Sequence, residues 1–199
     1  MDSYQFSFAS FLSLVIPLVV IPAAIGVGII WLTTRSATSD PRPAPHGVRP
    51  WVGWLTGGRL GLWTTGLAGV VWGFLACAGW LSWTASDKGG GFTGPGLPAP
   101  TSFPTWQVVA CGITVVAGAV LVSVCSRRLV PGALAAALGV ATGFSTAFAV
   151  GVATEVTSQE GIGVGLSMMG LTIGLGMVTW CVAGVRDWQI RRHPRDRRA

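Results

Sequence analysis

Two carboxylates, Glu155 and Glu160, stand close together in the short segment between the last two apolar stretches of the chain. A pair of carboxylates can act as general acid and general base, or can bind a cation. This pair has no neighbouring base and no aromatic wall beside it in the sequence. The pattern favours a solvated turn, with acid–base chemistry and cation binding as the alternatives.

Histidine, a common haem ligand and the usual base of a serine hydrolase, occurs twice, as His46 and His193. Both histidines fall outside the apolar stretches, so neither is placed to ligate a haem inside a membrane. His46 could pair with Asp40, although a solvated loop pair is the more common arrangement. The histidines therefore indicate neither a haem subunit nor an intramembrane hydrolase.

The four cysteines are Cys77, Cys111, Cys125 and Cys181. They form no CxxC pair and have no histidine nearby, whereas zinc and iron–sulfur sites need clustered ligands at characteristic spacing. A disulfide between Cys77 and Cys111 is geometrically conceivable, but small buried apolar side chains are the favoured interpretation. The sequence thus predicts no metal site, no cofactor and no enzymatic activity.

Hydroxyl side chains recur in the last two apolar stretches, where they could line a path for a solute. They are Thr142, Ser145, Thr146, Ser167, Thr172 and Thr179. Such hydroxyls also donate to carbonyls of their own helix, and this interpretation is favoured. Pro17 and Pro22 interrupt the first apolar stretch and predict a kink, which either opens a cavity or shapes the packing.

These residues belong to a chain that is too apolar for water. Of its 199 residues, 51% are hydrophobic and 10% are charged, against about a quarter charged in a soluble domain. A membrane helix needs roughly 20 apolar residues, and five stretches meet this requirement. They are residues 8–32, 60–83, 106–125, 130–153 and 162–185. We therefore predict an all-α, polytopic membrane bundle that forms a single domain over residues 1–199.

None of the five stretches contains Asp, Glu, Lys, Arg or His. Proton relays, ion-coupled carriers and voltage sensors usually place such residues within the membrane, so these classes are disfavoured. The first stretch also lacks the basic start of a signal peptide, because the chain begins Met1-Asp2. We expect it to be a retained helix.

Basic residues flank the five stretches on alternate sides. The Pro/Arg-rich loop 33–59 and the turn with Arg127 and Arg128 are basic, whereas the Gly/Pro-rich loop 84–105 has one lysine balanced by an aspartate. The tail 186–199 is also basic, with Arg186, Arg191, Arg192, Arg195, Arg197 and Arg198. Because cytoplasmic flanks carry the arginines, we predict the N-terminus outside, the C-terminus inside and a multi-pass location in a bacterial-type plasma membrane.

The tail arginines are expected to attract anionic lipid headgroups, each contributing about 1 kcal/mol. They serve either as a topology anchor, the favoured interpretation, or as a docking site for an acidic cytoplasmic partner. The basic residues are not spread over a general basic surface, which argues against nucleic-acid binding.

Small residues recur at helical spacing in three of the stretches. The stripes are Gly66, Gly69, Gly73 and Ala76; then Ala135, Gly139, Gly143, Ala147 and Gly151; then Gly163, Ser167, Gly170 and Gly174. Such stripes let helix backbones approach closely in lipid. They either hold the bundle together, the favoured interpretation for each stripe, or turn one face toward another membrane protein or a second copy.

The function predicted from these patterns is non-enzymatic. We expect an accessory or scaffolding subunit that associates through its small-residue helix faces. The alternative is a small permease, or permease subunit, for an uncharged or lipid-like solute.

Overall fold

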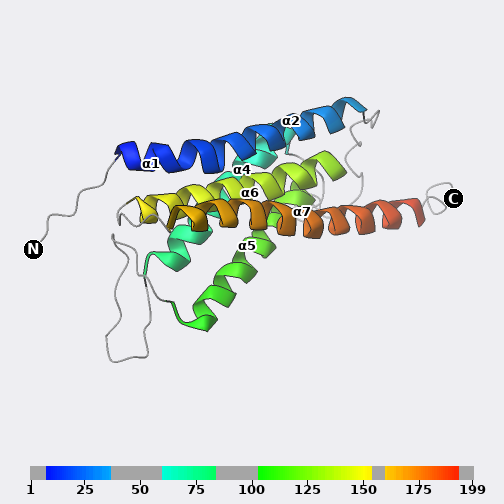
Figure 1. The fold of residues 1–199 in the computed structure, drawn as a ribbon. Helices are drawn as coiled ribbons and strands as arrows, with labels where there is room; N and C mark the ends of the chain where they lie inside the picture. The colour runs from blue at the N-terminus through cyan, green and yellow to red at the C-terminus, as the bar shows by residue number, and fades with distance from the viewer. Residues whose placement is uncertain (1–7, 37–59, 84–102, 154–159, 193–199) are drawn as a thin grey trace, which may run out of the picture.

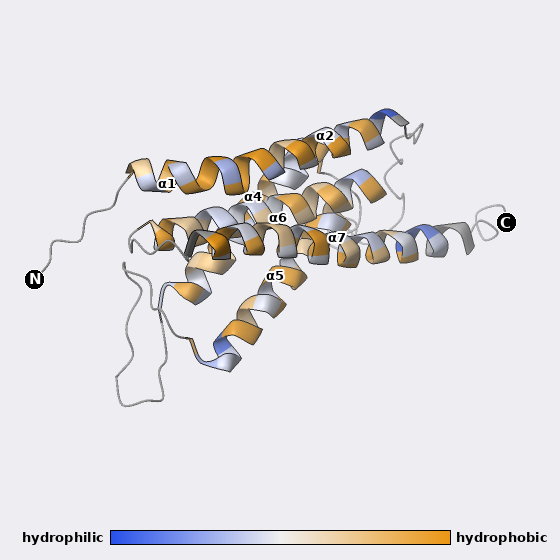
Figure 2. Cartoon of the chain, viewed as in Figure 1, coloured by the Kyte–Doolittle hydropathy of each residue, from blue (hydrophilic) through white to orange (hydrophobic). Residues whose placement is uncertain are grey.

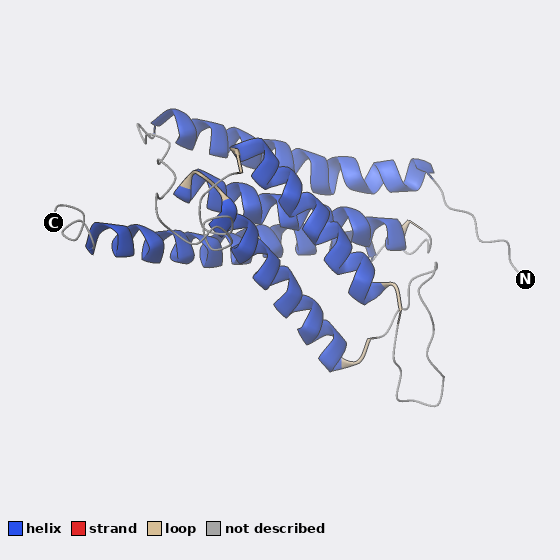
Figure 3. Ribbon diagram, turned by 180° about the vertical axis from the view of Figure 1, so that it is seen from behind, coloured by secondary structure: helices blue, strands red, loops and turns tan. Residues whose placement is uncertain are grey.

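The computed structural model describes residues 8–36, 60–83, 103–153 and 160–192. Every regular element in these ranges is a helix, as Figure 3 shows from behind, apart from one isolated bridge between Leu60 and Ser126. The elements are α1 (Phe8–Val15), η1 (Ile16–Val20), α2 (Ile21–Ser36), α4 (Leu62–Leu81), α5 (Thr105–Cys125), α6 (Leu129–Val152) and α7 (Glu160–Arg192). They form five helices long and apolar enough to cross a membrane, which confirms the predicted all-α bundle.

Hydropathy explains why the chain forms helices over these stretches. Figure 2 shows apolar residues along all the helices, with hydrophilic residues concentrated toward their ends. In hydrocarbon each backbone N–H and C=O must find a partner within the protein, and a helix provides one for nearly all of them.

The first span contains a π-helical turn rather than a broken helix. α1, η1 and α2 follow one another without a gap, and the N–H of Ile21 donates to the carbonyl of Ile16. Pro17 and Pro22 lack the N–H groups that an unbroken α-helical ladder needs, and a π turn is a common way to absorb such a defect. The kink predicted from the two prolines is therefore replaced by a wider, π-helical turn.

Helix α6 forms the centre of the bundle. In the most apolar 18-residue segment of α6, 61% of the residues are buried, against 28% or less in the corresponding segment of each of the other four spans. α6 packs against α4 and α7 most extensively, and also against α5 and the first span (Figure 1). Its Ala- and Gly-rich sequence suits this position, because small side chains let several helices approach one axis.

The two ends of the bundle differ in chemistry. One end, named here the basic end, has the arginines Arg35, Arg127, Arg128 and Arg186. The indole rings of Trp80, Trp83 and Trp106 cluster at the other end. The start of α1 and the end of α7 lie at opposite ends of the bundle (Figure 1), as an odd number of spans requires. Which end faces the cytoplasm stays a prediction from the arginine pattern.

Parts of the sequence-based expectations fall outside the described residues. Most of loop 33–59 and of loop 84–105 does so, as do Asp40, His46, Glu155 and His193. Of the tail, the structure describes residues 186–192, which continue α7 as helix beyond the span expected to end near Val185. Arg195, Arg197 and Arg198 lie beyond the described residues.

Candidate functional site

The small-residue stripes of α4 and α6 face each other. A Cβ placed at Gly73 would overlap the carbonyl oxygen of Val140, and one placed at Gly139 would overlap that of Gly66. A Cβ at Gly69 would lie 2.9 Å from the carbonyl oxygen of Ala136. The two helices therefore meet backbone to backbone, and these stripes are used within the bundle.

Gly143 belongs to the same contact, because a Cβ there would overlap the carbonyl oxygen of Val70. Ala76 and Ala135 are buried, while Ala147 and Gly151 are half-buried toward the other end of α6. These placements assign the remaining members of the two stripes to the bundle interior or its edge.

The α7 stripe is arranged differently. A Cβ at Gly163 would lie 3.3 Å from the ring of Phe148, whereas Cβ atoms at Gly170 and Gly174 would meet nothing within 4 Å. Ser167 pairs with Ser145 of α6, their hydroxyl oxygens lying 3.1 Å apart. The α7 stripe is thus partly internal and partly open.

Most of the hydroxyls considered for a polar path donate to their own helices. Thr142 donates to the Leu138 carbonyl at 2.7 Å, and Thr146 donates to the Thr142 carbonyl at 2.7 Å. The other such bonds run from Thr172 to Met168, from Ser167 to Val164 and from Thr179 to Leu175. The favoured interpretation is confirmed for these side chains, and they give no support to a hydroxyl-lined path.

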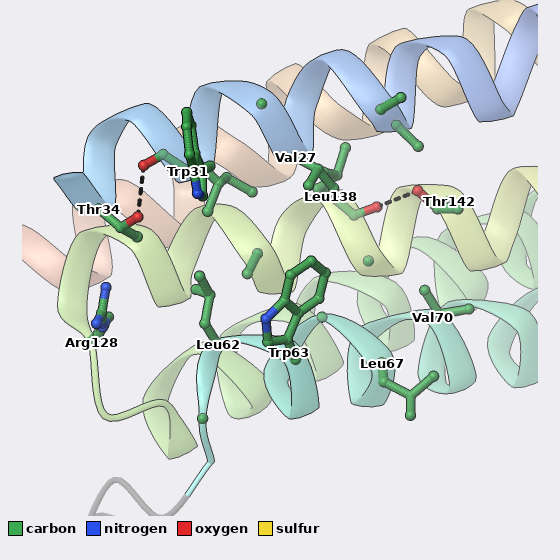
Figure 4. Close-up of a pocket in the computed structure, with 18 of the residues that line it drawn as sticks. Val27, Trp31, Thr34, Leu62, Trp63, Leu67, Val70, Arg128, Leu138 and Thr142 are labelled. Carbon is green, nitrogen blue, oxygen red and sulfur yellow. Dashed lines mark hydrogen bonds between the residues drawn. The ribbon is translucent and has the colours of Figure 1, made fainter.

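A groove of about 980 Å³ opens between α2 and α4, with α6 as its floor (Figure 4). This volume lies near the top of the usual range for ligand pockets, about 300–1,000 Å³. Its lining is Ala23, Ala24, Val27, Gly28, Ile30, Trp31, Thr34, Gly61, Leu62, Trp63, Gly66, Leu67, Val70, Arg127, Arg128, Ala135, Leu138, Gly139 and Thr142. We name it the lateral groove.

The groove is left open because α2 packs against α6 and makes little contact with α4. α2 comes close to α6 at Gly26, where a Cβ would lie 2.8 Å from the methyl groups of Leu138. Gly28, two residues nearer the basic end, has open space where its Cβ would be. Gly66, on the opposite wall, likewise has no closer neighbour to a Cβ than 3.9 Å. Because Gly28 and Gly66 have no side chains, they leave part of the groove volume open.

The polar groups of the lateral groove are few. The hydroxyl of Thr34 donates to the Trp31 carbonyl at 2.7 Å, and Thr142 donates within α6 in the same way (Figure 4). The charged lining residues are Arg127 and Arg128, both exposed and both at the basic end. The groove is therefore apolar along its length and basic at one end.

At the other end of the bundle, a buried amide joins α4 to α5. The side-chain nitrogen of Gln107 donates to the Trp83 carbonyl at 2.7 Å and also to the Trp80 carbonyl. These carbonyls belong to the last turn of α4 and its exit, where a helix has no partners of its own for them. Gln107 is fully buried, and its side-chain oxygen has no hydrogen-bond partner among the described residues.

Three indole rings cluster beside this amide connection. Trp106 meets Trp80 edge to face with ring centroids 6.4 Å apart, and its centroid lies 6.2 Å from that of Trp83. Gln107 was not predicted as a structural residue, because its amide is uncharged and stands outside the set of hydroxyls in the last two apolar stretches. A lone amide at the start of an apolar stretch was the available signal.

Trp72, near the middle of α4, packs against α5. Its indole nitrogen donates to the Thr114 carbonyl at 3.1 Å, and its ring occupies the space that a Cβ at Gly118 would need. Together with Gln107, this contact fixes α5 against α4. α5 therefore contributes to the bundle without lining the lateral groove.

Arg186 has a structural contact as well as its predicted role at the membrane surface. Its guanidinium donates to the Val124 carbonyl in the last turn of α5 at 3.1 Å. A cation at a helix C-terminus satisfies an unpaired carbonyl and interacts favourably with the helix dipole. The backbone at Arg191 and Arg192 continues α7.

The cysteines and acidic residues form no site within the described ranges. Cys77 and Cys111 are buried and all four cysteines are free thiols. In the part of the chain that the structure describes, no three His, Cys, Asp or Glu side chains gather as a metal ion would require. Glu160 begins α7, but its side chain lies outside the described set. The lateral groove is therefore the candidate site that the geometry offers.

Comparisons with family models, with curated proteins and with solved structures found no significant match to this chain.

Proposed function

We propose that this protein is a non-enzymatic membrane protein that binds one lipid-like molecule in the lateral groove. The observation that carries the proposal is an apolar groove of about 980 Å³, bounded by α2, α4 and α6. The sequence offers a permease for a lipid-like solute as the alternative function. Binding of the lipid in the lateral groove is the first step of such transport.

The length of the groove favours a lipid chain over a helix from another protein. Its α2 wall runs from Ala23 to Thr34 and its α4 wall from Leu62 to Val70. At about 1.5 Å per residue these walls are about 17 and 12 Å long, roughly half of a hydrocarbon core of about 30 Å. A transmembrane helix needs the full thickness, whereas an acyl chain occupies one leaflet.

The chemistry of the groove favours a chain over a polar solute. The two hydroxyls in its lining, on Thr34 and Thr142, already donate to carbonyls of their own helices. A sugar or polyol would lose its water without gaining matched partners along this wall, at a cost of about 1–3 kcal/mol for each group left unpaired. A hydrocarbon chain carries no such cost.

Filling the groove tests the proposal. Gly28→Phe places a ring into open space, because no atom lies within 4 Å of the Cβ position. We expect native mass spectrometry of the detergent-purified protein to show more than a tenfold loss of retained phospholipid. Covering about 60 Å² of apolar contact suffices for that change at about 25 cal/mol per Å², and a phenylalanine side chain covers more.

The matched control is Gly112→Phe on α5, which is exposed and likewise has no neighbour within 4 Å of a Cβ. Both substitutions replace a helical glycine with the same side chain, but Gly112 is not part of the groove lining. Equal lipid retention by the two variants would contradict lipid binding in the groove.

The accessory-subunit role remains a second proposal, supported by α7. Gly170 and Gly174 leave open space on this helix, and Met169 and Ile173 beside them are exposed. Close helix association in lipid uses faces of this kind. Mild solubilisation that yields only a monomer, with no companion protein, would count against this role.

A further inference from the structure

The basic end of the lateral groove has two guanidinium groups, on Arg127 and Arg128. They are the charged side chains in the groove lining, and both are exposed. All other lining residues are uncharged. An occupant that follows the groove from its apolar end therefore meets positive charge at one position, where the helices reach the membrane surface.

The backbone holds these two arginines at the groove entrance. The N–H of Arg127 donates to the Leu60 carbonyl at 3.1 Å, and the N–H of Leu60 donates to the Cys125 carbonyl at 3.2 Å. These bonds fasten the connection between α5 and α6 to the start of α4, which forms one wall of the groove. The position of the positive charge is thus set by the fold.

The opposite wall adds to this field. Figure 4 shows Arg128 at the start of α6, at the same end of the groove as Thr34 of α2. On that wall the guanidinium of Arg35 lies 3.5 Å from the ring centroid of Trp31, which also lines the groove. The N-terminus of α6 contributes a partial positive charge at the same place.

We propose that the occupant of the lateral groove is an anionic phospholipid whose phosphate headgroup is bound at Arg127 and Arg128. Guanidinium groups bind phosphate through paired, charge-assisted hydrogen bonds, and basic pockets between membrane helices bind acidic headgroups. One acyl chain lies along Val27, Leu62 and Leu67, in the leaflet on the basic side. This inference rests on the proposed function and specifies its ligand class.

Charge selectivity decides between an anionic lipid and lipids in general. The full-length protein is purified in mild detergent, mixed with equal amounts of phosphatidylglycerol and phosphatidylcholine, and examined by native mass spectrometry. We expect the wild-type protein to retain phosphatidylglycerol at least fivefold better, with a preference that falls as salt is raised. Arg128→Gln is expected to lower phosphatidylglycerol retention about fivefold and phosphatidylcholine retention less, because the choline ammonium already offsets the charge of the same phosphate.

Two further variants separate specific binding from general attraction. Arg128→Lys is expected to keep most of the preference, because the charge is retained. Lys88→Gln removes one positive charge from loop 84–105, outside the groove lining, and is expected to leave the preference unchanged. Loss of preference in Lys88→Gln equal to that in Arg128→Gln would overturn the proposal.

The wild-type measurement is decisive even if a variant fails to fold. Equal retention of both lipids, with both lost in Gly28→Phe, would overturn the anionic headgroup but leave lipid binding in the groove intact. Lipid retention by Gly28→Phe equal to that of the wild-type protein would overturn both proposals.

Discussion

Replacing Gly73 with valine is expected to prevent α4 and α6 from packing at their native distance. A Cβ at this position overlaps the carbonyl oxygen of Val140 and lies 2.9 Å from the backbone nitrogen of Phe144. Both obstacles are backbone atoms of a helix and cannot turn aside as a side chain could. We expect a destabilisation at or above the upper end of the about 1–3 kcal/mol that overpacking usually costs.

The measurement is the fraction of protein that remains monodisperse on size-exclusion chromatography after heating in detergent. Gly79→Val on the same helix is the control, because a Cβ at Gly79 meets nothing within 4 Å. Both variants replace a helical glycine with the same β-branched residue, so they differ in packing. If the two variants lost monodispersity at the same temperature, the backbone contact would not be limiting for stability.

Replacing Gln107 with methionine is expected to be the second most damaging change. Methionine is similar in size and fits apolar surroundings, but it cannot donate to the carbonyls of Trp80 and Trp83. A buried acceptor left without a partner costs about 1–3 kcal/mol. We expect a loss of stability of that size and faster hydrogen exchange in the last turns of α4.

The control for this variant is Thr64→Ala. Thr64 donates its hydroxyl to the Gly61 carbonyl at 2.9 Å at an exposed position of the same helix. A single exposed hydrogen bond contributes about 0.5–1.5 kcal/mol, and water can replace it. Unchanged exchange at the end of α4 in Gln107→Met would show that the amide does not hold the two helices together.

The membrane spans could be predicted from the sequence because lipid imposes a simple rule. A stretch long and apolar enough must become a helix, and the fourth stretch, expected over residues 130–153, forms α6 at Leu129–Val152. The π turn could not be predicted. Two prolines indicate that the hydrogen-bond ladder is interrupted, but the turn that absorbs the interruption depends on how α1 and α2 pack.

The sequence also indicated which helix faces would approach others, but not which helix each would meet. A stripe such as Gly139 and Gly143 marks a helix face for close approach, but its spacing does not identify the helix that packs against it. The structure pairs this stripe with α4. Trp72 shows the same limit, since its position allowed contact with a neighbour or with lipid, and the outcome depended on Gly118 in another helix.

The lateral groove could not be predicted because it arises between helices that are distant in sequence. Its walls come from α2 and α4, and its floor from α6. No sequence pattern relates Gly28 to Arg128. They line one groove because α2 packs against α6 and makes little contact with α4. A groove of this kind is a property of helix order and tilt, which the hydropathy profile does not contain.

The most direct test of lipid binding is photocrosslinking from inside the groove after purification in detergent. A photoreactive residue is introduced at Val27, which lines the groove, or at Ile113, which is exposed on α5 outside it. We predict that irradiation adds the mass of one phospholipid at Val27, while Ile113 captures detergent. Detergent alone at Val27, or a crosslink there to another protein, would contradict the account.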